Sequence, residues 1–315
     1  MFFRSRKQSR KLGSRKKLAI PPVERSRDGF GELAAVVIVK DEGAYIEEWL
    51  EFHRLMGCGH FYVYDNGSRD DTLEILGRYA REGLVTLTPW PRFDLNTGPQ
   101  VYAYAHALCT YGPQWRWMTF LDADEFLYPT VAETLTDALR DYEDIPAIAV
   151  PWRMFGYSGH ETRPGGTVIE NYVMRAPFPP PPDADELLKV KCIVDPTCVS
   201  RVVGVHMFDL TTGARTAYNE RKECVDYKSY KDRNLIADDV FRLNHYFTRS
   251  KEDFQRKVAK GSAARPTTES DGVPGDLAAD RRVRFSEMIE RNPVEDRTIQ
   301  RFVPPLERAL AEARS

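Results

Sequence analysis

The sequence predicts an α/β fold in which a mostly parallel sheet is flanked by helices and followed by a helical C-terminal tail. The first observation is the continuous apolar, partly β-branched run Leu33–Val39, which is typical of a strand buried on both faces. The second is the alternation of strand-like and helix-like segments as far as residue 121, which indicates right-handed crossovers. The third is the composition, with 42% hydrophobic and 29% charged residues, which is that of a soluble globular protein.

The elements of the first half follow from periodicity and from turn residues. Between residues 44 and 56, Ile46, Trp49, Leu50 and His53 form one helical stripe. Turn residues at 65–68 separate the next strand from a helix that begins near Asp70. The expected strands are 33–39, 60–64, 84–87 and 115–121, and the expected helices are 44–56, 70–81 and 100–110.

The second half is less regular. From Pro146 onwards the pattern is rich in short strands, and the prolines between 177 and 182 indicate a surface loop. Residues 261–276 resemble a loop and 277–315 resemble charged helices. We therefore expect a disordered basic leader at 1–30, one domain at 31–261, and a loop with a helical extension at 262–315.

Charge is unevenly distributed along the 315 residues, although the formal net charge is only −2. Residues 1–27 hold ten Lys and Arg and one Glu, which leaves a body with 35 basic and 46 acidic residues. An acidic body argues against a nucleic-acid partner. The leader is either a solvated tail or a weak contact with anionic lipid, and no apolar run is long enough to cross a membrane.

The five cysteines are spread along the chain without a C-x-x-C motif. An odd number of scattered cysteines favours reduced thiols over a disulfide framework or a zinc site. The leader also lacks the apolar segment of a signal peptide. We therefore expect a cytoplasmic protein, with a peripheral membrane contact through residues 1–27 as the alternative role of the leader.

Polar residues follow three of the predicted strands at the point where each ends: 40–42, 65–66 and 122–124. The carboxyl ends of parallel strands are where ligands bind in open α/β sheets. No glycine-rich dinucleotide fingerprint or P-loop follows any strand, so these two plans for a nucleotide site are excluded.

Asp122 and Asp124 directly follow the apolar strand 115–121. Carboxylates two residues apart on extended chain project to the same side and repel unless a cation or a proton intervenes. Mg²⁺ and Mn²⁺ prefer oxygen ligands and bridge carboxylate to phosphate. The alternative is an acidic turn that caps the next element, and the neighbouring polar strand ends favour the metal.

Five blocks of the sequence resemble glycosyltransferases of the GT-A fold, in family 2 and the related family 92. They occur in the order of the family, and the resemblance extends over residues 33–261. One departure is Asp41, where relatives usually carry Asn. The blocks are residues 39–53, 62–72, 120–127, 152–160 and 244–254.

The resemblance implies a donor site for a UDP-sugar at these strand ends. Asp65 would accept a hydrogen bond from uracil, beside Asn66 and Ser68, and Gln100 would face the donor. Lys40, Asp41 and Glu42 would line the base and the ribose. From the local sequence alone, residues 65–68 are equally explained as a turn before a helix.

The resemblance further implies a metal ion bound by Asp124, with Asp122 reaching the ribose or a metal-bound water. A third ligand would come from His245 or from His206. We prefer His245, because a cationic segment follows it and could close over a diphosphate as a mobile lid at 245–260. A solvated helix face is the alternative reading of these charges, which are Arg249, Lys251, Lys257 and Lys260.

The expected function is therefore transfer of a sugar from a UDP-sugar to a hydroxyl group of a glycan or other acceptor, with Mn²⁺ or Mg²⁺ as cofactor. Relatives mostly invert the anomeric centre, which calls for a carboxylate base. Glu125 and Glu161 are the two candidates for that base. The alternatives are a nucleotidyltransferase and a sugar- or nucleotide-binding module without catalysis.

Overall fold

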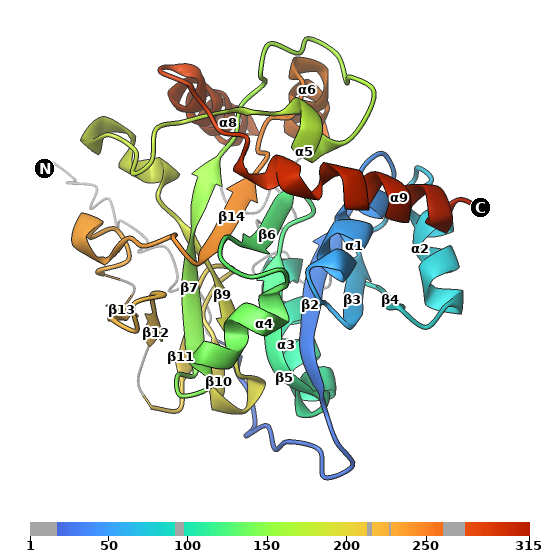
Figure 1. The fold of residues 1–315 in the computed structure, drawn as a ribbon, viewed down its shortest axis with the longest axis vertical. Helices are drawn as coiled ribbons and strands as arrows, with labels where there is room; N and C mark the ends of the chain where they lie inside the picture. Colours follow the sequence, from blue (N-terminus) through green and yellow to red (C-terminus); the bar gives the residue numbers. More distant parts are fainter. Residues whose placement is uncertain (1–17, 92–97, 213–215, 227, 261–274) are drawn as a thin grey trace, which may run out of the picture.

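The computed structural model describes residues 18–91, 98–212, 216–226, 228–260 and 275–315. Its centre is a mixed, mostly parallel sheet with helices on both faces, which confirms the predicted fold class (Figure 1). Within the described residues the sheet has the order β13-β12-β7-β9-β5-β2-β3-β4, and β14 pairs with both β6 and β7. No helix of the described residues is long and apolar enough to cross a membrane.

The first half alternates strands and helices as predicted. β2, β3, β4 and β5 run parallel, and the seven residues from Leu33 to Val39 are all buried. The elements are β1 (Leu18–Ala19), β2 (Gly31–Val39), α1 (Ile46–Leu55), β3 (His60–Asp65), α2 (Thr72–Arg81), β4 (Val85–Pro89), α3 (Pro99–Tyr111) and β5 (Trp115–Leu121).

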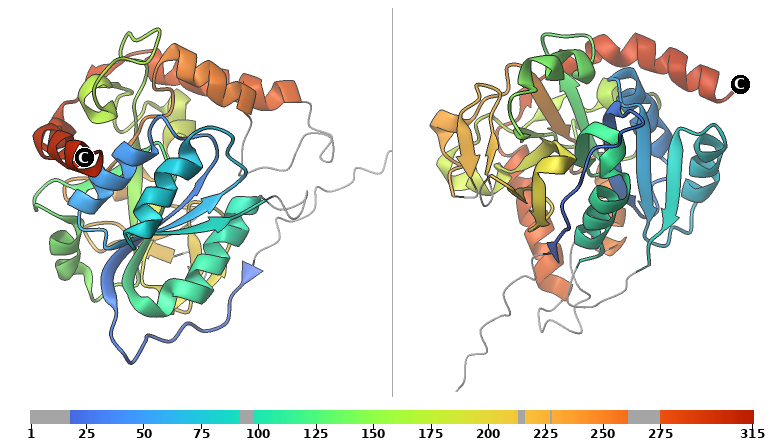
Figure 2. Two further views of the ribbon diagram at one scale, coloured as in Figure 1. Left: turned by 90° about the vertical axis from the view of Figure 1, so that its right-hand side faces the viewer. Right: turned by 90° about the horizontal axis from the view of Figure 1, so that it is seen from below.

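Alternate residues of β2 belong to two different cores. Leu33, Ala35 and Val37 pack with helices α1 and α2, whereas Ala34 and Val36 pack with α3. A strand that is covered on both faces needs apolar residues at every position, which explains the continuous run. Figure 2 shows α1 and α2 on one side of the sheet and α3 on the other.

The second half completes the sheet with short strands that cross the chain order. β9 is antiparallel to both β5 and β7 and lies between them. β14 is antiparallel to β6 and places His245 opposite Glu125. The elements are β6 (Glu125–Pro129), α4 (Leu135–Leu139), β7 (Ala147–Met154), α5 (Val168–Asn171), β8 (Met174–Arg175), β9 (Val190–Val194), β10 (Val199–Val202), β11 (Phe208–Leu210), β12 (Thr216–Tyr218), β13 (Cys224–Asp226), β14 (Phe241–His245) and α6 (Lys251–Lys260).

The C-terminal segment packs on the domain and is part of its core. Leu306 and Leu310 of α9 (Val303–Ala313) are buried, and α9 lies along α1 (Figure 1). Asp296 joins the segment to the sheet through Arg153 and Arg175. The preceding elements are α8 (Gly275–Glu290) and β15 (Val294–Glu295), and the predicted loop at 261–276 lies outside the described residues up to residue 274.

The predicted leader boundary at residue 30 differs from the structure. β1 pairs with β10, and Ile20 and Val23 are buried in the core that contains α3. The guanidinium of Arg25 lies 2.7 Å from the carboxylate of Asp195. Residues 18–30 therefore belong to the fold, and the rest of the predicted leader lies outside the described residues.

Candidate functional site

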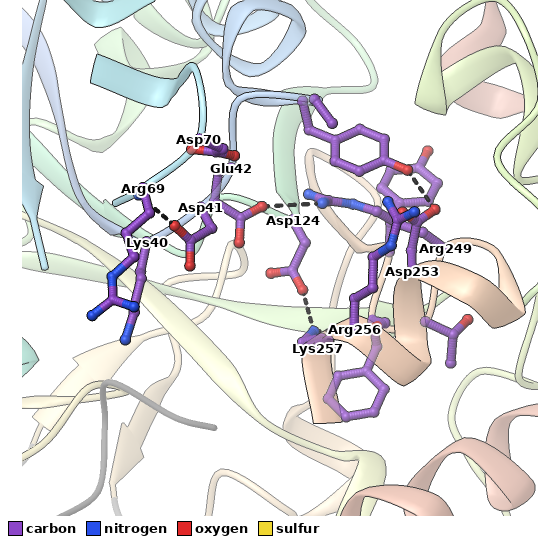
Figure 3. A pocket seen from close by; sticks show the side chains of 15 residues that line it. Lys40, Asp41, Glu42, Arg69, Asp70, Asp124, Arg249, Asp253, Arg256 and Lys257 are labelled. Atoms are coloured by element: carbon purple, nitrogen blue, oxygen red, sulfur yellow. Dashed lines mark hydrogen bonds and ion pairs between the residues drawn. The ribbon is translucent and has the colours of Figure 1, made fainter. Parts of the chain in front are cut away.

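An open cavity of about 480 Å³ lies at the carboxyl edge of the parallel strands (Figure 3). Its lining comes from the loop after β2, from the loop before α2, from Asp124, from the segment between β14 and α6, and from α6 itself. The charged side chains of the lining are five carboxylates and five cations: Asp41, Glu42, Asp70, Asp124 and Asp253, with Lys40, Arg69, Arg249, Arg256 and Lys257. Carboxylates and cations therefore occur in equal numbers in the lining, and each can favour the ionised form of a neighbour of opposite charge.

The loop after β2 is fixed by hydrogen bonds to the loop before α2. The backbone N–H of Asp41 donates to Ser68 Oγ (2.9 Å), and Asp41 Oδ1 accepts from the backbone N–H of Arg69 (2.7 Å). A Cβ atom at Gly43 would lie 2.0 Å from Asp71 Oδ1 and 3.0 Å from the backbone nitrogen of Thr72, so a larger residue would make the side chain of Asp71 move. The two loops therefore form one rigid wall of the cavity.

Asp41 has φ of +51°, a left-handed conformation that Asp and Asn tolerate better than other non-glycine residues. An Asn at this position would keep both the conformation and the oxygen that accepts from Arg69. The structure thus explains how Asp41 can stand where relatives usually carry Asn.

Asp124 lies between a lysine and a histidine from the second half of the chain. Lys257 Nζ is 2.5 Å from Asp124 Oδ2, and His245 Nε2 is 3.3 Å from Asp124 Oδ1. Burial opposes ionisation of Asp124, but Lys257 and His245 outweigh it and hold the pKa of this carboxyl well below its ordinary value. Asp124 is therefore an anion that faces the cavity (Figure 3).

Asp122 faces a different set of partners from Asp124. Its Oδ1 accepts from Gln100 Nε2 (2.7 Å) and lies 3.0 Å from Lys191 Nζ. Lys191 also lies 3.5 Å from Glu125 Oε2, and its side chain is only 2% exposed. Burial alone would lower the pKa of Lys191, but Asp122 and Glu125 raise it above its ordinary value.

Arg249 connects the two halves of the cavity. Its guanidinium donates to Glu42 Oε2 (3.1 Å) and to the carbonyl oxygen of Ala123 (2.8 Å), and it stacks 3.7 Å above the ring of Tyr45. A guanidinium fixed on several sides loses little freedom when it binds an anion, so Arg249 suits a phosphate group.

The structure brings together only part of the site predicted from sequence. Six of the predicted residues line the cavity: Lys40, Asp41, Glu42, Asp124, Arg249 and Lys257. Four others lie near the same edge of the sheet but outside the lining: Asp65, Asn66, Gln100 and Asp122.

Asp65 has the role that the turn interpretation gave it. Its carboxylate accepts from the backbone N–H groups of Gly67 (3.0 Å) and Ser68 (3.1 Å). Asn66 Nδ2 donates to the carbonyl oxygen of Trp90 (2.7 Å). Both side chains therefore shape the loop after β3.

The two histidines differ in position. His245 ends β14 beside Asp124, whereas His206 bonds the carbonyl oxygen of Val190 through Nδ1 (3.0 Å). Burial, together with Lys191, lowers the pKa of His206 to about 3. Among the described residues, no three His, Cys, Asp or Glu side chains form a metal-binding group.

Neither predicted base lines the cavity. Glu125 is fully buried, its Oε2 accepts from the backbone N–H of Asp122 (2.9 Å), and burial raises its pKa well above the ordinary value although Lys191 opposes this. Glu161 is 73% exposed and pairs with Lys251 at 2.6 Å. The structure therefore gives both residues a position away from the cavity.

The predicted lid at 245–260 has regular structure. His245 ends β14, and helix α6 carries Lys257 on the face that meets Asp124. The alternative interpretation as a helix face therefore describes the backbone here, and the helix is amphipathic with Phe254 buried. The closing of this segment over a diphosphate stays a prediction. The side chain of Lys260 lies outside the described residues.

Sequence reasoning missed several residues of the site. The cavity is also lined by Tyr45, Arg69, Asp70, Asp253 and Arg256, and Lys191 lies beside Asp122. Lys191 is the one charged residue of the apolar strand β9, which is an available signal. The contact between Tyr45 and Asp253 joins residues that are distant in the sequence, so no local pattern predicts it.

A mostly parallel sheet with helices on both faces and a charged cavity at its carboxyl edge is a GT-A type of architecture. A family model for glycosyltransferase family 92 matches residues 37–269. The chain belongs to glycosyltransferase family 92.

The chain is similar to curated family 92 relatives and, more distantly, to a solved structure. A glycosyltransferase family 92 protein of Ricinus communis is 24% identical over 292 residues, covering 87% of this chain and 48% of its own length. The galactan β-1,4-galactosyltransferase of Arabidopsis thaliana is 31% identical over 105 residues, covering 31% and 21%. TarS of S. aureus (residues 1–349) in complex with UDP-GlcNAc has a TM-score of 0.36 and 14% identity, covering 81% of this chain and 70% of that one. The chain spans less than half the length of the curated relatives, for example 30% of a family 92 protein of Oryza sativa.

Proposed function

We propose that this protein transfers a hexose, with inversion, from a UDP-sugar to a hydroxyl group of a glycan or other acceptor. The observation that carries the proposal is the cavity at the carboxyl edge of the sheet, where Asp124 faces Arg249 and Lys257. A diphosphate needs cations on one side, and its metal needs a carboxylate on the other. The relative from Arabidopsis thaliana named as a galactosyltransferase makes UDP-galactose the first donor to test.

We further propose that Mn²⁺ or Mg²⁺ binds to Asp124 and His245. Oxygen and imidazole nitrogen are both acceptable to Mn²⁺, and these two side chains meet from different strands. Asp122 is held by Lys191 and Gln100, so phosphate oxygens and water would complete the ligand set. When bound, such an ion neutralises charge that develops on the leaving diphosphate.

The residues of the chain would bind and orient the donor. Arg249, fixed by Glu42 and Ala123, would donate to phosphate oxygens without prior reorganisation. Lys257 pairs with Asp124 and would turn to the diphosphate when Asp124 takes the metal. The loops after β2 and β3 are joined by hydrogen bonds and would hold the nucleoside end of the donor.

The hydrogen bonds of the loop after β2 argue against the nucleotidyltransferase alternative. Such enzymes need backbone N–H groups that are free to cradle phosphate. Here the N–H groups of Asp41, Glu42 and Gly43 donate to Ser68 Oγ, Thr72 Oγ1 and Asp70 Oδ2. This loop is therefore a structural wall, and its amides are already used.

Calorimetric titration with UDP, with and without Mn²⁺, tests the proposal. We expect the wild type to bind UDP more tightly with Mn²⁺, and Asp124→Ala to lose the metal-dependent part of the affinity. Asp144→Asn is the control, because this carboxylate is 63% exposed and pairs with Lys222 away from the cavity. A screen of UDP release from UDP-sugars then identifies the donor. Equal UDP affinity with and without Mn²⁺ in the wild type would remove the metal assignment.

We also propose a cytoplasmic location, with the basic part of residues 1–27 that precedes Leu18 as a peripheral contact with anionic lipid. The support is the cluster of eight Lys and Arg residues in this part of the sequence. Sedimentation with anionic vesicles at low and high salt tests this, since a lipid contact of this kind is weakened by salt.

A further inference from the structure

Asp253 lies in the first turn of α6, and its carboxylate lines the cavity. Lys257 follows it by four residues, so both side chains lie on one face of the helix with Cβ atoms about 5–6 Å apart. Lys257 in turn holds Asp124. Asp253 therefore lies one helical turn from Lys257, which would contact the diphosphate under the proposed function.

Hydroxyl groups hold the carboxylate of Asp253. Tyr45 Oη donates to Asp253 Oδ2 at 2.5 Å, and Ser250 Oγ donates to the same oxygen at 2.6 Å. No ion pair of Asp253 with a Lys, Arg or His occurs among the described residues, and Oδ1 accepts no hydrogen bond from them. One oxygen is thus anchored, and the other is left for a ligand.

The other carboxylates of the cavity are already engaged. Asp124 pairs with Lys257 and Glu42 pairs with Arg249. Asp41 and Asp70 accept hydrogen bonds from the loop backbone. A carboxylate paired with a cation is a poor proton acceptor, because the cation stabilises the ionised form.

We propose that Asp253 is the general base that deprotonates the acceptor hydroxyl, an inference that rests on the proposed glycosyl transfer. The acceptor oxygen forms a bond to the anomeric carbon while the bond from that carbon to the β-phosphate oxygen of the donor breaks. The electron pair of the broken bond leaves with UDP. The hydroxyl proton passes to Asp253 Oδ1 and from there to solvent.

The test compares Asp253→Asn with Tyr45→Phe and Glu252→Gln. The readouts are UDP release from the UDP-sugar that the wild type turns over fastest, and calorimetric affinity for UDP with Mn²⁺. Loss of a general base lowers rates by about 10²–10⁴-fold, so kcat of Asp253→Asn should fall at least about 100-fold. Its affinity for UDP should stay within about threefold, because Asp253 does not hold the diphosphate. Asp253→Glu should recover at least about tenfold over Asp253→Asn, since the proton acceptor is restored.

Tyr45→Phe removes a donor to Asp253 but keeps the carboxylate, so it should cost less than about tenfold in kcat if Asp253 is the base. Glu252→Gln changes the adjacent residue, which pairs with Arg256, and should leave kcat unchanged. Three results would overturn the inference: Asp253→Asn within tenfold of the wild type, Tyr45→Phe as damaging as Asp253→Asn, or loss of UDP affinity in Asp253→Asn. If the wild type binds no UDP and releases none from any UDP-sugar, the proposed function itself fails.

Discussion

Lys191→Met tests the charge arrangement behind the acidic strand end. The ammonium of Lys191 is 2% exposed and lies 3.0 Å from Asp122 Oδ1 and 3.5 Å from Glu125 Oε2. Met has a similar length and no charge, so the variant fills the space and leaves both carboxylates without their cation. Glu125 is fully buried, whereas the side chain of Asp122 keeps 33% exposure.

The expected loss of stability can be estimated from this geometry. At an effective dielectric of about 20, a unit charge pair at these distances interacts by roughly 5 kcal/mol, and water screens the Asp122 share. In the variant, Glu125 can avoid an unpaired charge by taking up a proton. At pH 7.5 this costs about 4 kcal/mol for a group that has an ordinary pKa in the unfolded chain, so the part of the stability loss that comes from Glu125 cannot exceed this value. Removing one member of a buried pair typically costs about 3–5 kcal/mol. We expect a loss of about 3–4 kcal/mol.

Urea unfolding at pH 7.5 measures this loss as a change in midpoint at constant m-value. Lys189→Met is the matched control, because Lys189 precedes Lys191 by only two residues, is half-buried, and donates to Tyr230 Oη. It should cost less than about 1 kcal/mol. Adding Glu125→Gln to Lys191→Met should restore at least half of the loss. A loss below about 1 kcal/mol for Lys191→Met, or no recovery in the double variant, would refute the reasoning.

Three further predictions follow from the same structure. His245→Ala should lower the Mn²⁺-dependent part of the UDP affinity at least about tenfold in calorimetry, whereas His206→Ala should not, since a lost metal ligand acts only through the metal. Burial raises the pKa of Glu48 to about 7, although hydrogen bonds from backbone N–H groups and the charge of Arg249 oppose this rise. The folded state therefore favours the protonated carboxyl. The stability that protonated Glu48 contributes is present below about pH 4.5 and is lost as the pH rises through 7. Glu48→Gln should therefore match the wild type near pH 4 and exceed it by up to about 3 kcal/mol at pH 8 in urea unfolding. Deleting residues 1–27 should lower stability by at least about 2 kcal/mol because Ile20 and Val23 are buried, while a deletion ending at residue 17 keeps these contacts; equal melting temperatures for both deletions would contradict this.

The first half of the fold could be predicted because its signals are local. A strand covered on both faces must be apolar at every position, and Leu33–Val39 shows this directly. The order of the second half depends on pairings between distant residues. β6 directly follows the acidic pair, and its partner β14 lies more than 100 residues later, so no local pattern in the sequence announces the pairing.

The candidate site divides in the same way. Asp124 stood out because two carboxylates after an apolar strand are unusual in themselves. Lys191 and Asp253 did not, because a lysine in a strand and an acid in the first turn of a helix both have ordinary structural explanations. Only the fold shows that Lys191 points into the protein toward Glu125 and that Asp253 meets Tyr45.

The charges of the site come from different halves of the chain, and this makes the cavity depend on their packing. Glu42, Asp124 and Glu125 follow strands of the first half, and their cations Arg249, Lys257 and Lys191 come from the second half. Each cation stabilises a carboxylate that would otherwise repel its neighbours, so the halves hold each other in the absence of a donor. Under the proposed function, a diphosphate and its metal would take over these charge partners, because they bring both signs of charge. Binding would then change the partners of Asp124 and Lys257, while the buried pair of Lys191 and Glu125 would keep the strand ends in place.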